Sequence, residues 1–545
     1  LSLLKEKQQS LDCCIFLAKN LDFCYNKPMS KIYRLSFSIL QKIMLVLVVH
    51  WFFVSIFYIS EMSYWAYPIF GILLIGAYYY RKEVLKVYRY LMRHKLAIML
   101  AVIIFQLIMI WAAELLVRRD AAVVLNGAFR LLKETSISSY ITRNPNNLPL
   151  FLYERFFYKL FGESSALWIM QGLNMVYANL TACILYKGSQ KFFNQKSADI
   201  VFSLYVLLAG FSPYFFSMYT DIPPLPFISL QIFLIFGIFK ADSIKKLTAL
   251  SISLGLLTGF LYFVRPTVMI LLIAFFVTFF LQKQWKQFFL VLCVFSLSFA
   301  MLYSLVNTGI KNQNEVTIIQ KEGLTKGPLL FINLGLTYIG HNQADMKEGL
   351  LQYIEPSKRD DYNNGMFAKE NVIKEIKRRL KEYTPATFWG HLYYKQSLTV
   401  AEGTLGWLYR DVENEKTPFI NPLYEKTKNN PLAQFVRTFF LSIDKKEYVY
   451  YALIKQLVWI VMSLGLVMTL WKFRPDDRIN FLNLAVFGGL LFLQIFEGGK
   501  TRYLIQFLPQ ILLVSALGLS QYSQDLKKSR LWPKISKLKS LKRND

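Results

Sequence analysis

Long runs of apolar residues, separated by short polar segments, dominate the chain. A helix needs about 20 apolar residues to cross a bilayer, and fewer when it packs among other helices. Segments rich in Lys and Arg follow every second run, which is the bias expected of cytoplasmic loops. The pattern therefore predicts about twelve membrane-spanning helices with both termini on the cytoplasmic side. The predicted spans are 39–60, 64–80, 96–117, 166–186, 198–217, 222–240, 248–263, 267–281, 288–305, 447–472, 479–497 and 502–520.

The segment 145–162 competes for a further span. A crossing at this point would move all the later Lys-rich loops to the other side of the membrane, against the charge bias. Its helical pattern also separates Glu154, Arg155 and Lys159 from an apolar face. A helix with two such faces lies along the membrane interface, so we expect this segment on the outer surface.

The largest polar segment, 306–446, is long enough for a small domain and includes a predicted helix at 368–383. We therefore predict an all-α multi-pass transmembrane fold, with a mixed extracellular domain inserted before the last three spans. The predicted parts are 1–95 (cytoplasmic lead-in and two extra N-terminal spans), 96–305 (transmembrane core with a first outer loop, 118–165), 306–446 (extracellular domain), 447–520 (last three spans) and 521–545 (basic cytoplasmic tail).

Composition supports the membrane prediction and excludes several other classes. Of the 545 residues, 54% are hydrophobic and only 18% are charged, and the mean hydropathy is +0.33, whereas soluble proteins average about a quarter charged residues. The net charge of +28 comes from basic residues scattered between apolar runs, so we expect no nucleic-acid partner. The five Cys and four His show neither a disulfide framework nor a metal-ligand cluster.

Charged residues gather where predicted spans reach the outer face, at Asp120, Asp221, Arg265, Lys500 and Arg502. A single charge at the membrane edge is most often an anchor that extends into the headgroups. Carboxylates and cations repeated on the same side instead favour a cleft for an acid–base reaction on a phosphate-bearing substrate.

Three short motifs follow one another along the chain: RNPNNLPLFLYERFFYKLFG (143–162), YTDIPPLPF (219–227) and TRYLIQFLP (501–509). With an acidic residue just beyond the third span, they resemble the GT-C-type, polyprenol-dependent membrane glycosyltransferases, in particular the protein-mannosyltransferase and aminoarabinose-transferase relatives (glycosyltransferase family 39). The segments 328–345 and 393–407 resemble a Gram-positive multi-pass glycosyltransferase-like group. The resemblance covers roughly 96–520. The first loop has a single Asp instead of an acidic pair, and NNLP replaces the commoner H-P-P-L.

The resemblance implies a GT-C-like transmembrane core and an enzyme of the cell membrane with its active site facing outside. It would move a sugar from a polyprenyl-phosphate carrier to a cell-envelope glycan, lipid or protein, with inversion. Membrane lipids are further expected partners. No cofactor is certain, and a divalent metal is possible. The donor sugar and the acceptor stay open.

Roles for individual residues also follow from the resemblance. Asp120 would be the general base that deprotonates the acceptor hydroxyl, and Asp221 would shape the same pocket or help hold an acceptor or a metal. Arg265, Lys500 and Arg502 would offset the charge of the departing phosphate. The remaining expected substrate-binding residues are Tyr503, beside these cations, and Asn146 and Asn147, which would hydrogen-bond sugar hydroxyls. Trp389, Trp407 and the turn 403–406 would form either a stacking platform or part of a domain core.

Other classes remain open at this point. A transporter or flippase of lipid-linked sugars would explain the many spans, but transporters usually show internal repeats with broken helices at the midplane. A ligase or polymerase of lipid-linked glycans would call for Arg and His pairs in the late outer loop, where His341 and His391 occur. A structural membrane protein without catalysis is the remaining alternative.

Overall fold

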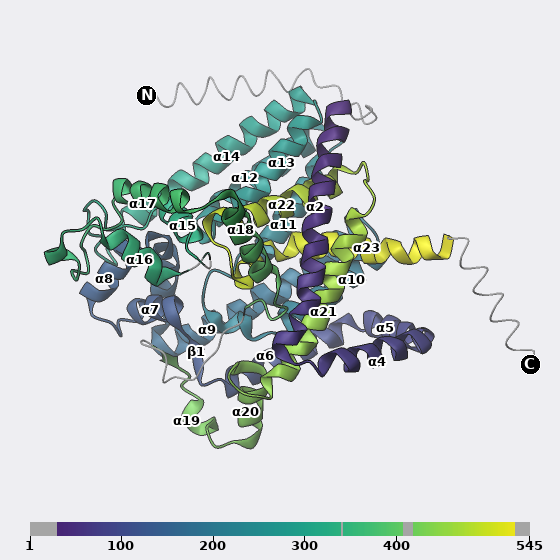
Figure 1. The fold of residues 1–545 in the computed structure, drawn as a ribbon, viewed down its shortest axis with the longest axis horizontal. Coiled ribbons are helices and arrows are strands. Elements are labelled where there is room, and N and C mark those ends of the chain that lie inside the picture. Colours follow the sequence, from purple (N-terminus) through teal and green to yellow (C-terminus); the bar gives the residue numbers. More distant parts are fainter. Residues whose placement is uncertain (1–29, 339, 341, 407–417, 529–545) are drawn as a thin grey trace, which may run out of the picture.

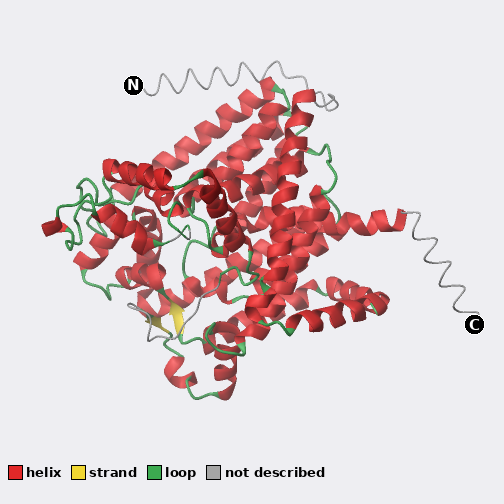
Figure 2. Cartoon of the chain, in the orientation of Figure 1, coloured by secondary structure: helices red, strands yellow, loops and turns green. Residues whose placement is uncertain are grey.

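A computed structural model describes residues 30–338, 340, 342–406 and 418–528. Helices form nearly all of its regular structure (Figure 2), which confirms the all-α prediction. Within the described residues the only strands are β1 (Leu115–Val117) and β2 (Phe419–Ile420), which pair antiparallel. The predicted cytoplasmic lead-in up to residue 29 and the tail from residue 529, like Trp407, lie outside the described residues.

Helices occupy all twelve predicted spans. Among the described residues, seven helical segments are long and apolar enough to cross a membrane. They are Lys31–Met62, made of α2 (Lys31–Phe57) and α3 (Ile59–Met62), α6 (Lys95–Ala112), α12 (Ile244–Val264), α14 (Trp285–Lys311), α21 (Tyr448–Leu470), α22 (Asp477–Phe496) and Thr501–Gln521, made of η8 (Thr501–Phe507) and the first part of α23 (Leu508–Lys528). Three shorter apolar helical segments are α4 (Ala66–Tyr79), α11 (Leu225–Phe239) and Pro266–Leu281, the last made of η4 (Pro266–Val268) and α13 (Met269–Leu281). The two other predicted spans correspond to the second part of α9 (Leu148–Phe192) and to α10 (Gln195–Tyr205) with the π-helical turn η2 (Val206–Gly210). The number of helices that cross the membrane stays a prediction.

The helices form one bundle, in which α12, α13 and α14 lie side by side and α2 runs along α21 (Figure 1). Trp51 of α2 and Trp459 of α21 are both fully buried, with ring centroids 5.4 Å apart. The first predicted span is therefore part of the core. By contrast, α4 and the basic helix α5 (Arg81–Arg93) project away from the bundle.

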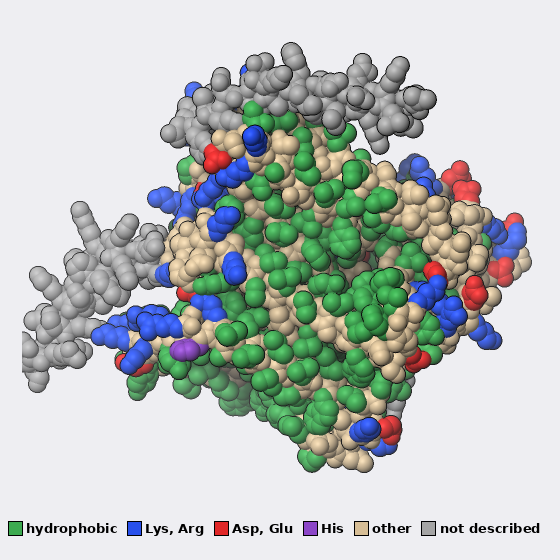
Figure 3. All heavy atoms as spheres, turned by 180° about the vertical axis from the view of Figure 1, so that it is seen from behind, with side chains coloured by type: hydrophobic (Ala, Val, Ile, Leu, Met, Phe, Trp, Pro, Cys, Tyr) green, Lys and Arg blue, Asp and Glu red, His purple; other side chains and the backbone are tan. Residues whose placement is uncertain are grey.

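Segments predicted to be cytoplasmic lie together at one end of the bundle. Lys95 forms an ion pair with Asp199 (2.8 Å), and the hydroxyl of Ser197 donates to that of Ser520 (2.9 Å). On one face, apolar side chains cover the middle, with Lys and Arg along one edge and charges of both signs at the opposite edge (Figure 3). This distribution is the one expected of a bundle whose middle faces lipid and whose two ends face water.

The segment 145–162 contains η1 (Pro145–Asn147) and the first part of α9, which bends at Gly162, where φ is 72°. Phe156 and Leu160 on its apolar face are 56% and 58% exposed, as an interfacial helix requires. On the charged face, Lys159 is exposed and forms an ion pair with Glu315, whereas the other two charged residues meet protein. Glu154 is fully buried, and Arg155 is buried and donates to the carbonyl of Gly127 in α7 (Arg119–Ala128) at 3.1 Å.

The predicted extracellular region is mostly helical in its described part. Its helix at 368–383 is confirmed as α17 (Lys369–Glu382). A small separate core joins its first half, made of Leu330, Leu334, Met346, Leu350, Met366, Phe367 and Val372. Because β2 pairs with β1, this region is also tied to the end of the predicted span 96–117. There α6 ends at Ala112 and the chain forms a strand, so the helix is shorter than predicted. The remaining elements of the two outer segments are α8 (Glu134–Arg143), α15 (Pro328–Gly335), α16 (Gln343–Leu351), η5 (Pro356–Lys358), α18 (Pro385–Val400), α19 (Tyr424–Thr427), α20 (Pro431–Val436) and η7 (Arg437–Leu441).

Candidate active site

The predicted outer turns meet around one cavity of about 780 Å³, which we call the first cavity. The turns come from distant parts of the chain: the start of α7, the segment after η3 (Pro213–Ser217), and the link between α22 and η8. The predicted site residues that line the cavity are Asp120, Asp221, Lys500, Arg502 and Tyr503. The others, Arg265, Asn146 and Asn147, lie outside its lining.

Local backbone geometry brings Asp120 to the cavity. The chain leaves β1 and turns at Arg119, whose φ of 54° lies in the left-handed region. A non-glycine residue held there costs roughly 1–3 kcal/mol, and such strain gathers at functional sites. Asp120 follows in the first turn of α7, where the helix dipole favours a negative charge, and its side chain is exposed. Met218, with a φ of 50°, makes the same kind of turn directly before Tyr219, another lining residue.

Asp221 is 1% exposed and lies between two arginines. Its Oδ2 accepts hydrogen bonds from Nε (3.0 Å) and Nη2 (2.7 Å) of Arg502, and its Oδ1 accepts one from Nη1 of Arg265 (3.3 Å). Arg265 also donates to the hydroxyl of Thr220 (2.9 Å) and to Oε1 of Gln506 (3.1 Å). Both carboxylate oxygens are therefore engaged, and two cations around one anion leave a fixed positive charge beside the cavity.

A polar network joins Asp120 to these cations. The hydroxyl of Tyr140 lies within hydrogen-bonding reach of Asp120 and accepts a hydrogen bond from Nδ2 of Asn147 (2.9 Å). The hydroxyl of Tyr219 donates to Oδ1 of Asn147 (3.1 Å), and the guanidinium of Arg502 lies 5.4 Å from the Tyr219 ring centroid. Burial and the nearby Asp120 raise the pKa of Tyr219 to about 12, so this hydroxyl keeps its proton.

Asn146 and Asn147 lie behind the wall of the first cavity and do not line it. Asn147 is 3% exposed, and its amide is used by the two tyrosines. Asn146 donates to Oδ1 of Asn147 (3.3 Å). In this structure both residues support the wall, and the direct contact with sugar hydroxyls that the sequence suggested stays a prediction.

Lys500 enters the cavity from a turn that requires glycine. Gly498 and Gly499 have φ values of 92° and 72°, and a Cβ on Gly498 would lie 2.2 Å from a side-chain carbon of Lys395. Burial, and then the charges of Arg119 and Arg502, lower the pKa of Lys500 to about 8. Near neutral pH this ammonium is therefore charged but close to its titration range.

The sequence interpretation missed several lining residues, of which Glu402 is the most informative. Burial raises the pKa of this carboxyl, and the hydroxyl of Thr404 donates to it. A signal existed, because Glu402 is the only charged residue between 396 and 409. Tyr58, directly after α2, also lines the cavity although the motif resemblance began only at about residue 96.

The predicted stacking platform is only partly assembled. Gly406 lines the cavity, whereas Trp389 is 69% exposed on α18 and so is not part of a core. Trp407 lies outside the described residues.

A metal site was a further possibility. Among the described residues, no group of three or more His, Cys, Asp or Glu side chains is arranged to hold a metal ion. Asp221, the residue suggested for that purpose, has its oxygens directed at Arg265 and Arg502. The donor set around the cavity therefore does not fit a metal, and we derive no step through one.

A family model described as "Conserved hypothetical integral membrane protein" matches residues 63–523. The chain belongs to this family. It is accordingly a multi-pass integral membrane protein, as the apolar pattern predicted. The match begins after α2, so Tyr58 comes from a part of the chain that the family model does not cover. A comparison with curated proteins finds no match.

Two crystal structures of ArnT from Cupriavidus metallidurans are similar to this member of the family. The apo structure is 12% identical over 78% of this chain and 77% of that chain, with a TM-score of 0.30. The structure bound to undecaprenyl phosphate is 12% identical over the same shares, with a TM-score of 0.28. At such TM-scores this likeness carries no argument about the site, which is interpreted from the geometry of the first cavity alone.

Proposed function

We propose that the protein is a membrane glycosyltransferase that moves a sugar from a polyprenyl-phosphate carrier to a cell-envelope acceptor on the outer face of the cell membrane. One observation carries the proposal: an exposed carboxylate, Asp120, and the cations Lys500 and Arg502 line the same cavity. General-base catalysis needs the first group, and a phosphate leaving group needs the second.

In the proposed reaction Asp120 accepts the proton of the acceptor hydroxyl. The hydroxyl oxygen forms a bond to the anomeric carbon of the donor sugar, and the bond between that carbon and the phosphate oxygen breaks. The bonding electron pair stays on the phosphate, which gains one negative charge. A single displacement of this kind inverts the anomeric configuration.

Arg502 and Lys500 would stabilise the negative charge that develops on the departing phosphate. Asp221, which Arg265 also contacts, holds Arg502 in place, so the guanidinium of Arg502 needs little reorganisation as the charge develops. A guanidinium also matches the geometry of phosphate oxygens. Lys500 adds a second positive charge to the lining. In this account Asp221 acts through the two arginines as a positioning residue.

The membrane setting agrees with a lipid-linked donor. The first cavity lies where helical segments of the bundle end, between η8, the start of α7 and the segment after η3. A polyprenyl chain could remain in the bilayer while its phosphate reaches the cavity. The positive-inside bias assigns this end to the outside. The ArnT structure with undecaprenyl phosphate holds a carrier of the same chemical class.

Release of the carrier tests the proposal. The purified protein in proteoliposomes is incubated with envelope extract and with a radiolabelled sugar linked to polyprenyl phosphate. We expect free polyprenyl phosphate and label in the extract, with neither product in protein-free liposomes. A flippase would move the intact lipid-linked sugar across the bilayer, and a ligase or polymerase would require a diphosphate-linked glycan. Intact donor after incubation with a folded protein would contradict the proposal.

A further inference from the structure

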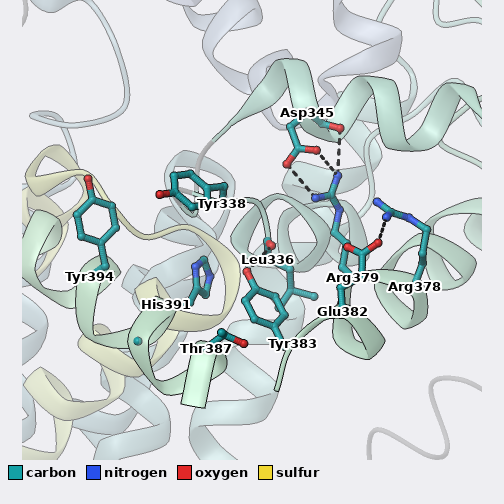
Figure 4. A pocket seen from close by; sticks show the side chains of 11 residues that line it. Leu336, Tyr338, Asp345, Arg378, Arg379, Glu382, Tyr383, Thr387, His391 and Tyr394 are labelled. Atoms are coloured by element: carbon teal, nitrogen blue, oxygen red, sulfur yellow. Dashed lines mark hydrogen bonds and ion pairs between the residues drawn. The ribbon is translucent and has the colours of Figure 1, made fainter. Parts of the chain in front are cut away.

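A second cavity, of about 680 Å³, lies in the outer region between α17, α18 and the segments around α15 and α16. Figure 4 shows aromatic side chains on one side and ion pairs on the other. The aromatic side is formed by Tyr338, Tyr383, His391 and Tyr394. None of these residues belongs to the first cavity.

The ion pairs of the second cavity leave no spare positive charge. Arg379, which is 5% exposed, contacts Asp345 and Glu375, both at 2.9 Å. Arg378 contacts Glu375 (2.6 Å) and Glu382. Two guanidinium groups thus face three carboxylates, and this balance disfavours a phosphate or another anionic ligand. The same groups present fixed donors and acceptors of the kind that hydroxyl groups use.

The aromatic side combines fixed and accessible rings. The hydroxyl of Tyr383 donates to the carbonyl of Leu336 (3.0 Å), and the ring of His391 packs on that of Tyr383 with centroids 5.2 Å apart. Tyr338 and Tyr394 are 82% and 47% exposed. Accessible tyrosine faces beside a polar rim suit a pyranose ring, which has an apolar C–H face and a periphery of hydroxyl groups.

A glycine lies in the wall of the second cavity. Gly390 lies within α18 and lines the cavity, and a Cβ built on it would meet no atom within 4 Å. Alanine would fit there without a clash and would improve the helix. A large side chain at this lining position would instead add bulk at the wall of the cavity.

The two cavities share structural elements. Asn342 and Gln343, at the start of α16, line the first cavity, and Asp345, two residues later, lines the second. On α18, Tyr394 lines the second cavity and Leu398 lines the first. Four residues of an α-helix span about 6 Å, so a short oligosaccharide could lie across both.

We propose that the second cavity is an acceptor subsite that binds an uncharged saccharide unit, while the acceptor hydroxyl of a neighbouring sugar reaches Asp120. This inference rests on the proposed glycosyltransferase function and specifies it, because it makes the acceptor a glycan. The subsite contributes binding, and the chemical step takes place in the first cavity.

Binding to a microarray of bacterial cell-envelope oligosaccharides tests the subsite without any need for catalysis. The probe is the full-length, fluorescently labelled protein in nanodiscs. We expect the wild type and Gly390→Ala to bind the same uncharged oligosaccharides, and Gly390→Trp to bind them at least about tenfold more weakly, which corresponds to the loss of one good contact. Tyr338→Ala should lose about as much, whereas Tyr338→Phe keeps the ring and should bind as the wild type does.

Two outcomes would overturn the subsite: no binding of the wild type above protein-free nanodiscs, or equal binding by Gly390→Trp and Gly390→Ala. Asp120→Asn separates the subsite from the proposed reaction, because it should bind the array as the wild type does. A wild type that binds the array but releases no carrier would contradict the glycosyltransferase proposal alone. In a transfer assay, Gly390→Trp should raise the KM for the glycan acceptor and leave kcat unchanged, which is the signature of lost ground-state binding.

Discussion

Arg502 and Asp221 form a two-point ion pair in the wall of the first cavity, with Oδ2 of Asp221 3.0 Å from Nε and 2.7 Å from Nη2 of Arg502. Arg265 contacts the other carboxylate oxygen. Because the buried carboxylate is occupied on both sides, it fixes the guanidinium groups, whereas the side chain of Asp120 in the same lining is exposed.

Replacement of Arg502 tests its role toward the phosphate. Loss of one fixed charge-stabilising group typically costs a factor on the order of 100 in rate, and we expect this decrease in sugar transfer for Arg502→Ala. Arg502→Lys keeps the charge but loses the planar two-point contact. Its rate of sugar transfer should therefore lie between those of the wild type and Arg502→Ala. Arg359→Ala, at an exposed arginine of the outer region, is the control. Wild-type transfer by a folded Arg502→Ala protein would show that this arginine is only a structural anchor.

The lowered pKa of Lys500 predicts that kcat/KM for the donor depends on pH. Its pKa is lowered to about 8, so the ammonium is charged below that pH and is lost as the pH rises through it. Since kcat/KM reports the free enzyme, kcat/KM for the donor should fall up to about tenfold per pH unit above 8. In Lys500→Arg the charge persists to a much higher pH, and the decrease should disappear. The same alkaline profile in both proteins would remove Lys500 from donor binding.

The orientation in the membrane is tested by cysteine labelling in a background without native cysteines. Asp360 lies in the predicted extracellular region and Gln190 in a predicted cytoplasmic loop, and both side chains are exposed. On intact cells, an impermeant thiol reagent should label Asp360→Cys and should not label Gln190→Cys until the cells are opened. The reverse pattern would place the first cavity on the cytoplasmic side.

The sequence predicted much of the helix layout because apolar runs and Lys-rich loops are local signals. It also located Asp120, Asp221, Lys500 and Arg502, since charges at the ends of apolar runs are conspicuous. It did not reveal that Asp221 is enclosed by arginines, or that Glu402 lines the same cavity. Those relationships join residues between 44 and 281 positions apart, so no local pattern encodes them.

The burial of Glu154 is another feature that a local sequence pattern cannot predict. The alternation of charged and apolar residues predicted two helix faces in the segment 145–162, and the structure has them. The pattern could not tell whether the charged face meets water or protein. Packing against α7 decides this, and α7 follows a left-handed turn at Arg119 that nothing in the residue pattern announces.

A stability prediction concerns Lys455 in α21. Its buried ammonium donates to the carbonyls of Leu207, Leu208 (3.1 Å) and Phe211 (2.6 Å), in and just after the π-helical turn η2. The Phe211 carbonyl also accepts from the hydroxyl of Tyr451 (3.1 Å). Lys455→Met would remove the buried donor that all these carbonyls share, and a buried acceptor left unsatisfied costs about 1–3 kcal/mol. Thermal unfolding in detergent should therefore show a clear decrease in stability. Lys446→Met, at an exposed lysine just before α21, should stay within about 0.5 kcal/mol of the wild type, and an equal melting temperature for both variants would contradict the role of Lys455.

The most direct test of the central claim is sugar transfer by Asp120→Asn, compared with donor binding by the same protein. The amide keeps the shape of the side chain but cannot accept the proton of the acceptor hydroxyl. We predict that the variant folds, binds the polyprenyl-phosphate donor with wild-type affinity, and transfers sugar at least about a hundredfold more slowly, the usual scale of a lost general base. Asp361→Asn, at an exposed aspartate of the outer region, should transfer at the wild-type rate. Wild-type transfer by a folded Asp120→Asn protein would contradict the account.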